Sequence, residues 1–429
     1  MLLVAVACVL VVAPLVVHDI ARKPSRGLGL YLLALVAVPY WIGASIGGRF
    51  LPVAVIAGVG CLVMLRRSGE RRLAFPDLVV MAMVAVLLLL WLLGLSLGEH
   101  VVAAVTVILV PFLLGRRLGS PEYRASVTET LAVAGTCVAA LGLIEFLLDF
   151  HPFQGLTLGT GPDRIWSPIQ YRAGFPRSEL GFGHSIAYGN FVAICVPFAV
   201  MSRRNGFVRA GMIAVMMAGI CVSFSRNAIL AGGIALVLAI VLERRASGVS
   251  FGRVMVLGVV GLLAAVTLPV YFDAIGSRGE LASSSAYRSG YLTVLGDIRA
   301  FGLAADIYTH DSLGRFAWLA AGYPGGKIVT LDSTPLLWAL QFGWIVLGLF
   351  LLFLLWSGLA LVRRPSAATI ALVSQTITIA TVAPITQYPY LYWLIAGIAV
   401  SWACNHRLHR PPQPDDDATA RPPMTRTGR

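Results

Sequence analysis

Residues 210–245, AGMIAVMMAGICVSFSRNAILAGGIALVLAIVLERR, decide the fold class. Two apolar runs are separated by a short polar stretch in which Arg226 has no acidic residue nearby. Apolar runs of about 16–24 residues recur along the chain, and each is long enough to cross a bilayer as a helix. Because the runs are continuously apolar rather than alternating, helices fit them better than the strands of a barrel.

The composition of the 429 residues agrees with this interpretation. The chain is 58% hydrophobic and only 12% charged, with a mean hydropathy of +0.83, whereas soluble domains carry about 25% charged residues. We predict an all-α polytopic membrane protein with about 12–13 transmembrane helices and two long extracytoplasmic loops, the second partly helical. The expected helices lie near 2–18, 28–46, 50–65, 76–97, 101–115, 127–148, 186–202, 210–224, 227–242, 254–272, 336–360, 368–385 and 389–404.

The basic residues predict the orientation in the membrane. One set of connections, together with the C-terminal tail, carries 23 of the 33 Lys and Arg residues, and the positive-inside rule places this set in the cytoplasm. The net charge of +13 is therefore a topology signal and not a nucleic-acid footprint. The chain divides into N-terminal helices (1–148), a first extracytoplasmic loop (149–185), further helices (186–272), a large extracytoplasmic loop (273–335), C-terminal helices (336–404) and a disordered cytoplasmic tail (405–429).

The cysteines give no sign of a disulfide framework or a metal site. All six lie inside apolar runs, and no CxxC or His/Cys cluster is present. We expect neither a metal nor another cofactor. The first segment lacks the charged start of a cleaved signal peptide, so it is predicted to be a transmembrane helix; lipidation of Cys8 is a minor alternative.

Arg226 lies at the outer mouth of the turn between the two runs in this topology. Ser225 and Asn227 flank it and are suited to cap the returning helix. A cation at a helix start meets the positive end of the helix dipole, so both features favour a bound anion. The alternative is an arginine that marks the membrane boundary.

The first outer loop holds further candidates for anion binding. Arg172 and Arg177 lie in YRAGFPRSELGFGH, where glycines allow close backbone approach and guanidinium groups pair with phosphate oxygens. The simpler alternative is a local salt bridge with Glu179 or Asp163. His184 begins the next helix and is more typical of a cap than of a base.

The second outer loop holds the remaining candidates. Arg288 lies near the start of a predicted surface helix, where it binds phosphate or anchors the helix at the interface. Asp332 and Ser333 occupy an N-cap position, with Pro335 in the first turn; Asp332 is also a candidate for proton transfer. His310 and Asp311 form another possible base.

Several of these stretches, taken in order, resemble one family. They are YRAGFPRSELGFGHSIAYGNFVAICVPFAV (171–200), SFSRNAILAGGIALVLAI (223–240), AYRSGYLTVLGDIRAFGLAAD (286–306) and LDSTPLLWALQFGWIVLGLF (331–350). The sequence over roughly 160–350 resembles the O-antigen ligase/polymerase family of bacterial surface-polysaccharide assembly. The flanking helices are similar only in general character.

The resemblance implies a membrane glycosyltransferase in the bacterial inner membrane, with its active face outside and no metal or nucleotide sugar. Its partners would be a polyprenyl-diphosphate-linked glycan donor, a glycan acceptor, the lipid bilayer and other envelope-polysaccharide assembly proteins. Arg226 and Arg288 would hold the diphosphate and act in catalysis, together with Asp332, and Arg172 and Arg177 would add to diphosphate binding.

Ligases of the family usually carry His-Asn where this chain has Asp332-Ser333. This difference favours a polymerase, which joins one lipid-linked glycan to a hydroxyl of another. The alternatives are a ligase that passes glycan to a different acceptor, a flippase for lipid-linked oligosaccharide, and a receptor or scaffold. A flippase should place charge along a central cavity, whereas the helix interiors here are poor in charge and Glu145 is the main exception.

Overall fold

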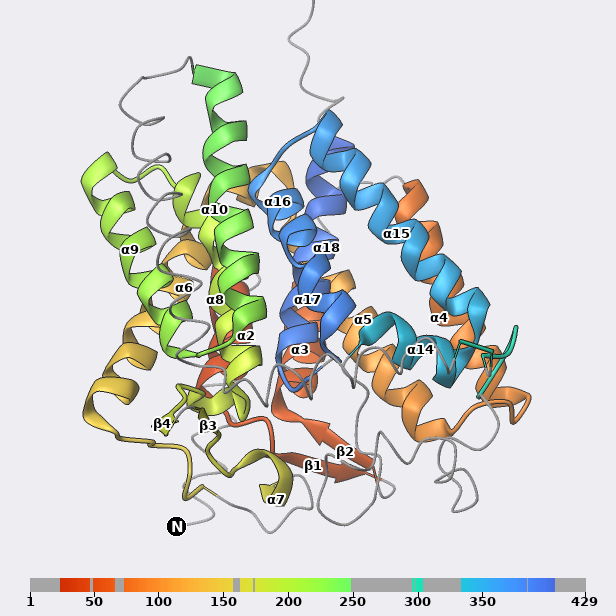
Figure 1. Cartoon of the computed structure of the whole chain (residues 1–429). Helices are drawn as coiled ribbons and strands as arrows, with labels where there is room; N and C mark the ends of the chain where they lie inside the picture. The colour runs from red at the N-terminus through yellow and green to blue at the C-terminus, as the bar shows by residue number, and fades with distance from the viewer. Residues whose placement is uncertain are drawn as a thin grey trace, which may run out of the picture.

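The computed structural model describes residues 24–46, 49–65, 73–156, 163–172, 174–247, 295–296, 298–303, 333–383 and 385–405. The described part is a bundle of α-helices with two small β-hairpins at one end (Figure 1). Five of its helices are long and apolar enough to cross a membrane, so the predicted membrane-protein class is supported. These five are Phe75–Leu92, His100–Leu118, Pro121–Leu148, Arg226–Glu243 and Trp344–Arg363.

The helical elements follow the apolar runs. They are α2 (Pro24–Ala37), α3 (Val53–Met64), α4 (Phe75–Leu92), α5 (Gly98–Leu118), η1 (Pro121–Tyr123), α6 (Arg124–Leu148), α7 (Asp163–Trp166), η2 (Leu180–Phe182), α8 (Ser185–Val200), α9 (Gly206–Val222), α10 (Arg226–Ser247), α14 (Thr334–Phe342), α15 (Trp344–Arg363), α16 (Ala367–Ser374), α17 (Thr376–Thr381) and α18 (Tyr388–Asn405). The hairpins pair β1 (Gly43–Ile46) with β2 (Arg49–Pro52), and β3 (Tyr171–Arg172) with β4 (Phe175–Pro176), both antiparallel.

Helix α8 lies at the centre of one half of the bundle, between α6, α9 and α10 (Figure 1). Nearly all of its side chains are buried, as expected for a helix that is apolar on every side. Small residues allow its neighbours to approach closely. A Cβ added at Gly142 of α6 would overlap the Tyr188 ring, and one added at Gly189 would lie 2.7 Å from the Ser223 hydroxyl.

In the other half, α5 and α18 cross at very short range. A Cβ added at Gly115 would overlap the carbonyl oxygen of Leu394, and one added at Gly397 would overlap that of Phe112. These contacts involve backbone atoms, which cannot rotate away as a flexible side chain can. The crossing therefore depends on glycine at both positions.

A buried ion pair joins three helices at the end of the bundle opposite the hairpins. Arg116 of α5 contacts both carboxylate oxygens of Asp77 of α4 at 2.8 Å, and its Nη1 donates to the Ser401 hydroxyl of α18 at 2.8 Å. Such paired geometry offsets the free-energy cost of removing two charges from water. The pair fixes the register of α4, α5 and α18.

Three predicted helices differ from the structure. The helix expected over 28–46 ends at Ala37, because Pro39 follows and residues 43–46 pair with β2. The helix expected over 336–360 is divided at Gly343, which adopts φ +92°. The helix expected over 368–385 is interrupted at Gln375 and ends at Thr381.

Other predicted features are confirmed or lie outside the described residues. Ser333 caps α14 by accepting from the Leu336 N–H at 3.4 Å, and Pro335 lies in the first turn. The expected helices 2–18 and 254–272 fall outside the described residues.

We predict that Gly115→Ala destabilises the protein by about 1–3 kcal/mol, because the added methyl group has no space at the α5–α18 crossing. Gly348→Ala on α15 is the matched control, since nothing lies within 4 Å of the added Cβ. The control should be neutral or slightly stabilising. Thermal unfolding in detergent measures both, and equal melting temperatures would contradict the crossing.

Candidate functional site

The turn between α9 and α10 is the centre of the candidate site. Ser223 is the C-cap residue that follows α9, and Phe224 adopts a left-handed φ of 49°. The Ser225 hydroxyl accepts the Ala228 N–H at 3.4 Å and so caps α10. The predicted cap by Ser225 is therefore confirmed. Arg226 is the first residue of α10 and is half-buried.

Two arginines from the loop before α8 meet this turn. Nη1 of Arg172 donates to the Phe224 carbonyl at 3.1 Å, and Nε of Arg177 donates to the Ser223 carbonyl at 2.9 Å. Arg172 lies 52 residues before its acceptor in the sequence, and Arg177 lies 46 residues before its own. The structure thus brings Arg172 and Arg177 to the turn at which Arg226 begins α10. The start of α10 lies at the end of the bundle that carries the hairpins (Figure 1).

Aromatic packing covers the turn. The Phe224 ring stacks on Phe175 of β4, with centroids 6.1 Å apart, and contacts Phe146 of α6 at 5.6 Å. These rings explain how Phe224 is held in a backbone conformation that is unusual for a bulky residue. They also attach the β3–β4 hairpin, which carries Arg172, to the turn.

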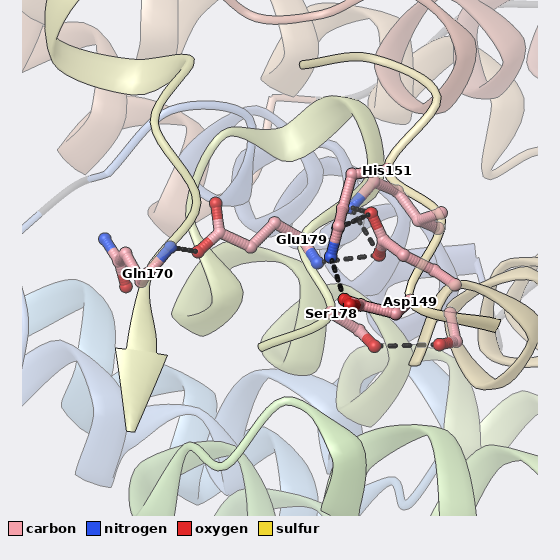
Figure 2. A network of polar contacts seen from close by, with 8 residues as sticks. Asp149, His151, Gln170, Ser178 and Glu179 are labelled. Carbon is pink, nitrogen blue, oxygen red and sulfur yellow. Dashed lines mark hydrogen bonds and ion pairs between the residues drawn. The ribbon is translucent and has the colours of Figure 1, made fainter. Parts of the chain in front are cut away.

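A network of polar contacts joins the loop before α8, which carries Arg172 and Arg177, to α6 (Figure 2). The Glu145 carboxylate of α6 accepts the backbone N–H groups of Glu179 (2.9 Å) and Leu180 (3.0 Å), and it lies 3.1 Å from Nδ1 of His151. The Ser178 hydroxyl donates to the Gly142 carbonyl at 2.7 Å. The loop is therefore fixed to α6 over consecutive residues.

The network continues to Arg177. The Glu179 carboxylate accepts the Gln170 N–H at 3.1 Å, and the Gln170 side-chain oxygen accepts from Nη1 of Arg177 at 3.0 Å. Arg177 is only 8% exposed, so it acts mainly in positioning the turn. Arg172 and Arg226 are half-buried as whole residues.

Burial changes the pKa of the Glu179 carboxyl in this loop. It raises the pKa of the Glu179 carboxyl to about 8; the Gln170 N–H and the Arg177 charge oppose the rise, and the Glu145 charge adds to it. At neutral pH burial therefore favours the protonated form of this carboxyl.

His184 caps α8 rather than acting as a base. Its Nδ1 accepts the Ile186 N–H at 3.1 Å. Desolvation and then the nearby Arg177 charge lower the pKa of His184 to about 3, so the imidazole is neutral. The predicted capping role is confirmed.

The remaining predicted residues, Arg288, Asp332, His310 and Asp311, lie outside the described residues. Within the described ranges, no group of three His, Cys, Asp or Glu side chains is arranged to hold a metal ion.

The contacts by which Glu145, Glu179 and Gln170 position the loop before α8 were not predicted from the sequence. An acidic residue inside an apolar run was the available signal for Glu145, because such a residue needs a buried partner. Nothing in the local sequence singles out Gln170.

Comparisons of the chain with protein-family models, with curated proteins and with solved structures found no match.

We predict that Glu179→Gln becomes more stable relative to the unsubstituted protein as the pH rises from about 5 to 9. The folded-state pKa of about 8 lies above the ordinary value, so the proton on Glu179 stabilises the fold at low pH. That contribution is lost as the pH rises towards about 8. Glutamine has no proton to lose, and the difference in melting temperature should grow by several degrees.

Glu129→Gln is the matched control. Its carboxylate pairs with Arg204 at 2.9 Å near the other end of α6, and an ordinary carboxyl is already ionised at pH 5. The control should shift the melting temperature by a constant amount. A constant offset for Glu179→Gln as well would contradict the raised pKa.

Proposed function

We propose that this chain is a membrane glycosyltransferase that transfers glycan from a polyprenyl-diphosphate donor to a hydroxyl of a second lipid-linked glycan. The reaction takes place at the outer face of the bacterial inner membrane. The proposal rests on the family resemblance and on one structural observation, the convergence of Arg172 and Arg177 on the turn where Arg226 begins α10.

The electrostatics of this turn support a diphosphate as the ligand. Guanidinium groups pair well with phosphate oxygens, and the start of α10 adds the positive end of a helix dipole. A diphosphate head group at a lipid surface matches a cationic site at the end of a transmembrane helix.

The chemistry requires stabilisation of the departing group. The acceptor hydroxyl oxygen bonds to the anomeric carbon, and the bond from that carbon to the diphosphate oxygen breaks. The polyprenyl diphosphate leaves with the electron pair. Arg226 and Arg172 would bind the charge that develops on it, and Arg177 would hold the turn in place.

The hydroxyl proton must pass to a base. Asp332 remains the predicted base, and Arg288 the predicted fourth cation, both outside the described residues. The presence of Asp332-Ser333 in place of His-Asn favours polymerisation over ligation.

The orientation in the membrane follows from the same proposal. We propose about 12–13 spans, with the N-terminus outside and the C-terminus inside. This topology would put the Ser223–Arg226 turn outside and the Asp77–Arg116 pair near the cytoplasm.

We predict that, in a chain without its six native cysteines, Gln154→Cys reacts with a membrane-impermeant maleimide in intact cells. Arg203→Cys, at the opposite end of the bundle, should react only after lysis. Mass-tag gel shifts measure both variants, and the reverse pattern would place the turn in the cytoplasm and contradict the proposed orientation.

We predict that Arg226→Ala lowers glycan transfer at least 100-fold, the usual effect of removing a group that stabilises transition-state charge. Arg226→Lys should also fail, because an ammonium group cannot reproduce a bidentate guanidinium contact. The assay incubates purified protein with a short polyprenyl-diphosphate glycan.

Arg203→Ala is the control for loss of a positive charge and should keep full activity. A ladder of products supports a polymerase, and a single transfer to another acceptor supports a ligase. Unchanged substrate with the unsubstituted protein, or normal chain lengths with Arg226→Ala, would overturn the proposal.

A further inference from the structure

A cleft lies at the same end of the bundle as the Ser223–Arg226 turn. It is a cleft of about 320 Å³ between β2, the first turns of α5, α14 and the start of α18. Its volume is at the lower end of the range of small-molecule sites, roughly 300–1,000 Å³. The lining runs along α5 from His100 to Val107, a length of about 10 Å along the helix axis.

The walls of the cleft combine aromatic rings with a few polar groups. Tyr40, Phe50, Trp338, Phe342 and Tyr390 supply the rings. None of the lining residues is Asp, Glu, Lys or Arg. Flat aromatic surfaces without a charged partner favour a neutral ligand with an apolar face.

The lining also contains a threonine, Thr386, whose hydroxyl has no hydrogen-bond partner among the described residues. Thr386 is 4% exposed. Burying a hydroxyl without a partner is unfavourable, and so such a group usually indicates a missing ligand or water. His100, Thr106 and Gln341 place further polar side chains in the same lining.

The cleft is connected to the Ser223–Arg226 turn by direct contacts. The Tyr40 ring, which lines the cleft, lies edge-on to Trp166 at 6.2 Å, and Trp166 lies edge-on to His184 at 6.1 Å. Leu337, also in the lining, packs with Trp166 on the small apolar cluster around Val382. Only one layer of side chains therefore separates the cleft from the loop that carries Arg177.

We propose that this cleft binds one sugar ring of the acceptor glycan, away from the ring whose hydroxyl attacks the donor. A sugar is neutral, has an apolar face for the aromatic rings, and carries hydroxyls for the polar lining residues. This inference rests on the proposed function, because it supplies the acceptor for the donor held at the Ser223–Arg226 turn. The acceptor chain would extend from the cleft past the loop before α8, so that its reacting hydroxyl meets the donor.

The test measures binding separately from transfer. The probe is the oligosaccharide released by mild acid from the host's own lipid-linked glycan, titrated by calorimetry into protein in lipid nanodiscs. We expect Thr386→Val to weaken binding about 5-fold or more through loss of one hydrogen bond. Valine is also β-branched, so the left-handed φ of 44° at this position is affected equally.

Ala103→Trp is the second variant, because a large side chain at this lining position fills the cleft; it should abolish binding. Thr136→Val is the matched control, since its hydroxyl already donates to the Ala132 carbonyl at 2.8 Å on α6, and it should bind as the unsubstituted protein does. In the transfer assay, Thr386→Val should raise the acceptor KM and leave the donor KM unchanged.

Unchanged oligosaccharide affinity in both cleft variants would overturn the inference. Displacement of the oligosaccharide from the unsubstituted protein by the prenol farnesol would overturn it as well, because the site would then take a lipid chain. Full transfer activity with these results would leave the proposed function standing and remove only the acceptor site. Conversely, binding that is lost in Thr386→Val would support the cleft even if no transfer were detected.

Discussion

The position of the loop before α8 against the Ser223–Arg226 turn depends on the Glu145 carboxylate. This carboxylate accepts two successive backbone N–H groups of the loop. Those N–H groups would otherwise be buried without acceptors, which is unfavourable away from water. By satisfying them, α6 fixes the loop, and the loop in turn places Arg177 on the Ser223 carbonyl and Arg172 on the Phe224 carbonyl. One acidic residue in an apolar helix thus determines where the cationic turn lies.

Burial also affects the acidic residue that follows Ser178 in this loop. It raises the pKa of the Glu179 carboxyl to about 8, and the Arg177 charge opposes the rise. The cleft lined by Tyr40 and Thr386 has no Asp, Glu, Lys or Arg in its lining, which is why we proposed a neutral ligand for it.

Much of the fold follows from hydropathy, because each long apolar run must satisfy its backbone hydrogen bonds as a helix. The turn at Ser225 and the cap at Ser333 were predictable from local chemistry. The breaks at Gly343 and Gln375 were not, because hydropathy averages over a whole run and does not register a local change of direction. For Arg172, Arg177 and Arg226 only a shared outer face was predicted. The contacts of Arg172 and Arg177 with the turn before Arg226 depend on packing between segments about fifty residues apart.

The most direct measurement is a cryo-electron microscopy structure of the protein in nanodiscs with polyprenyl diphosphate bound. We predict diphosphate density within hydrogen-bond distance, about 3 Å, of the Arg226 guanidinium at the start of α10. A head group bound elsewhere, with the Ser223–Arg226 turn empty at saturating ligand, would contradict this prediction.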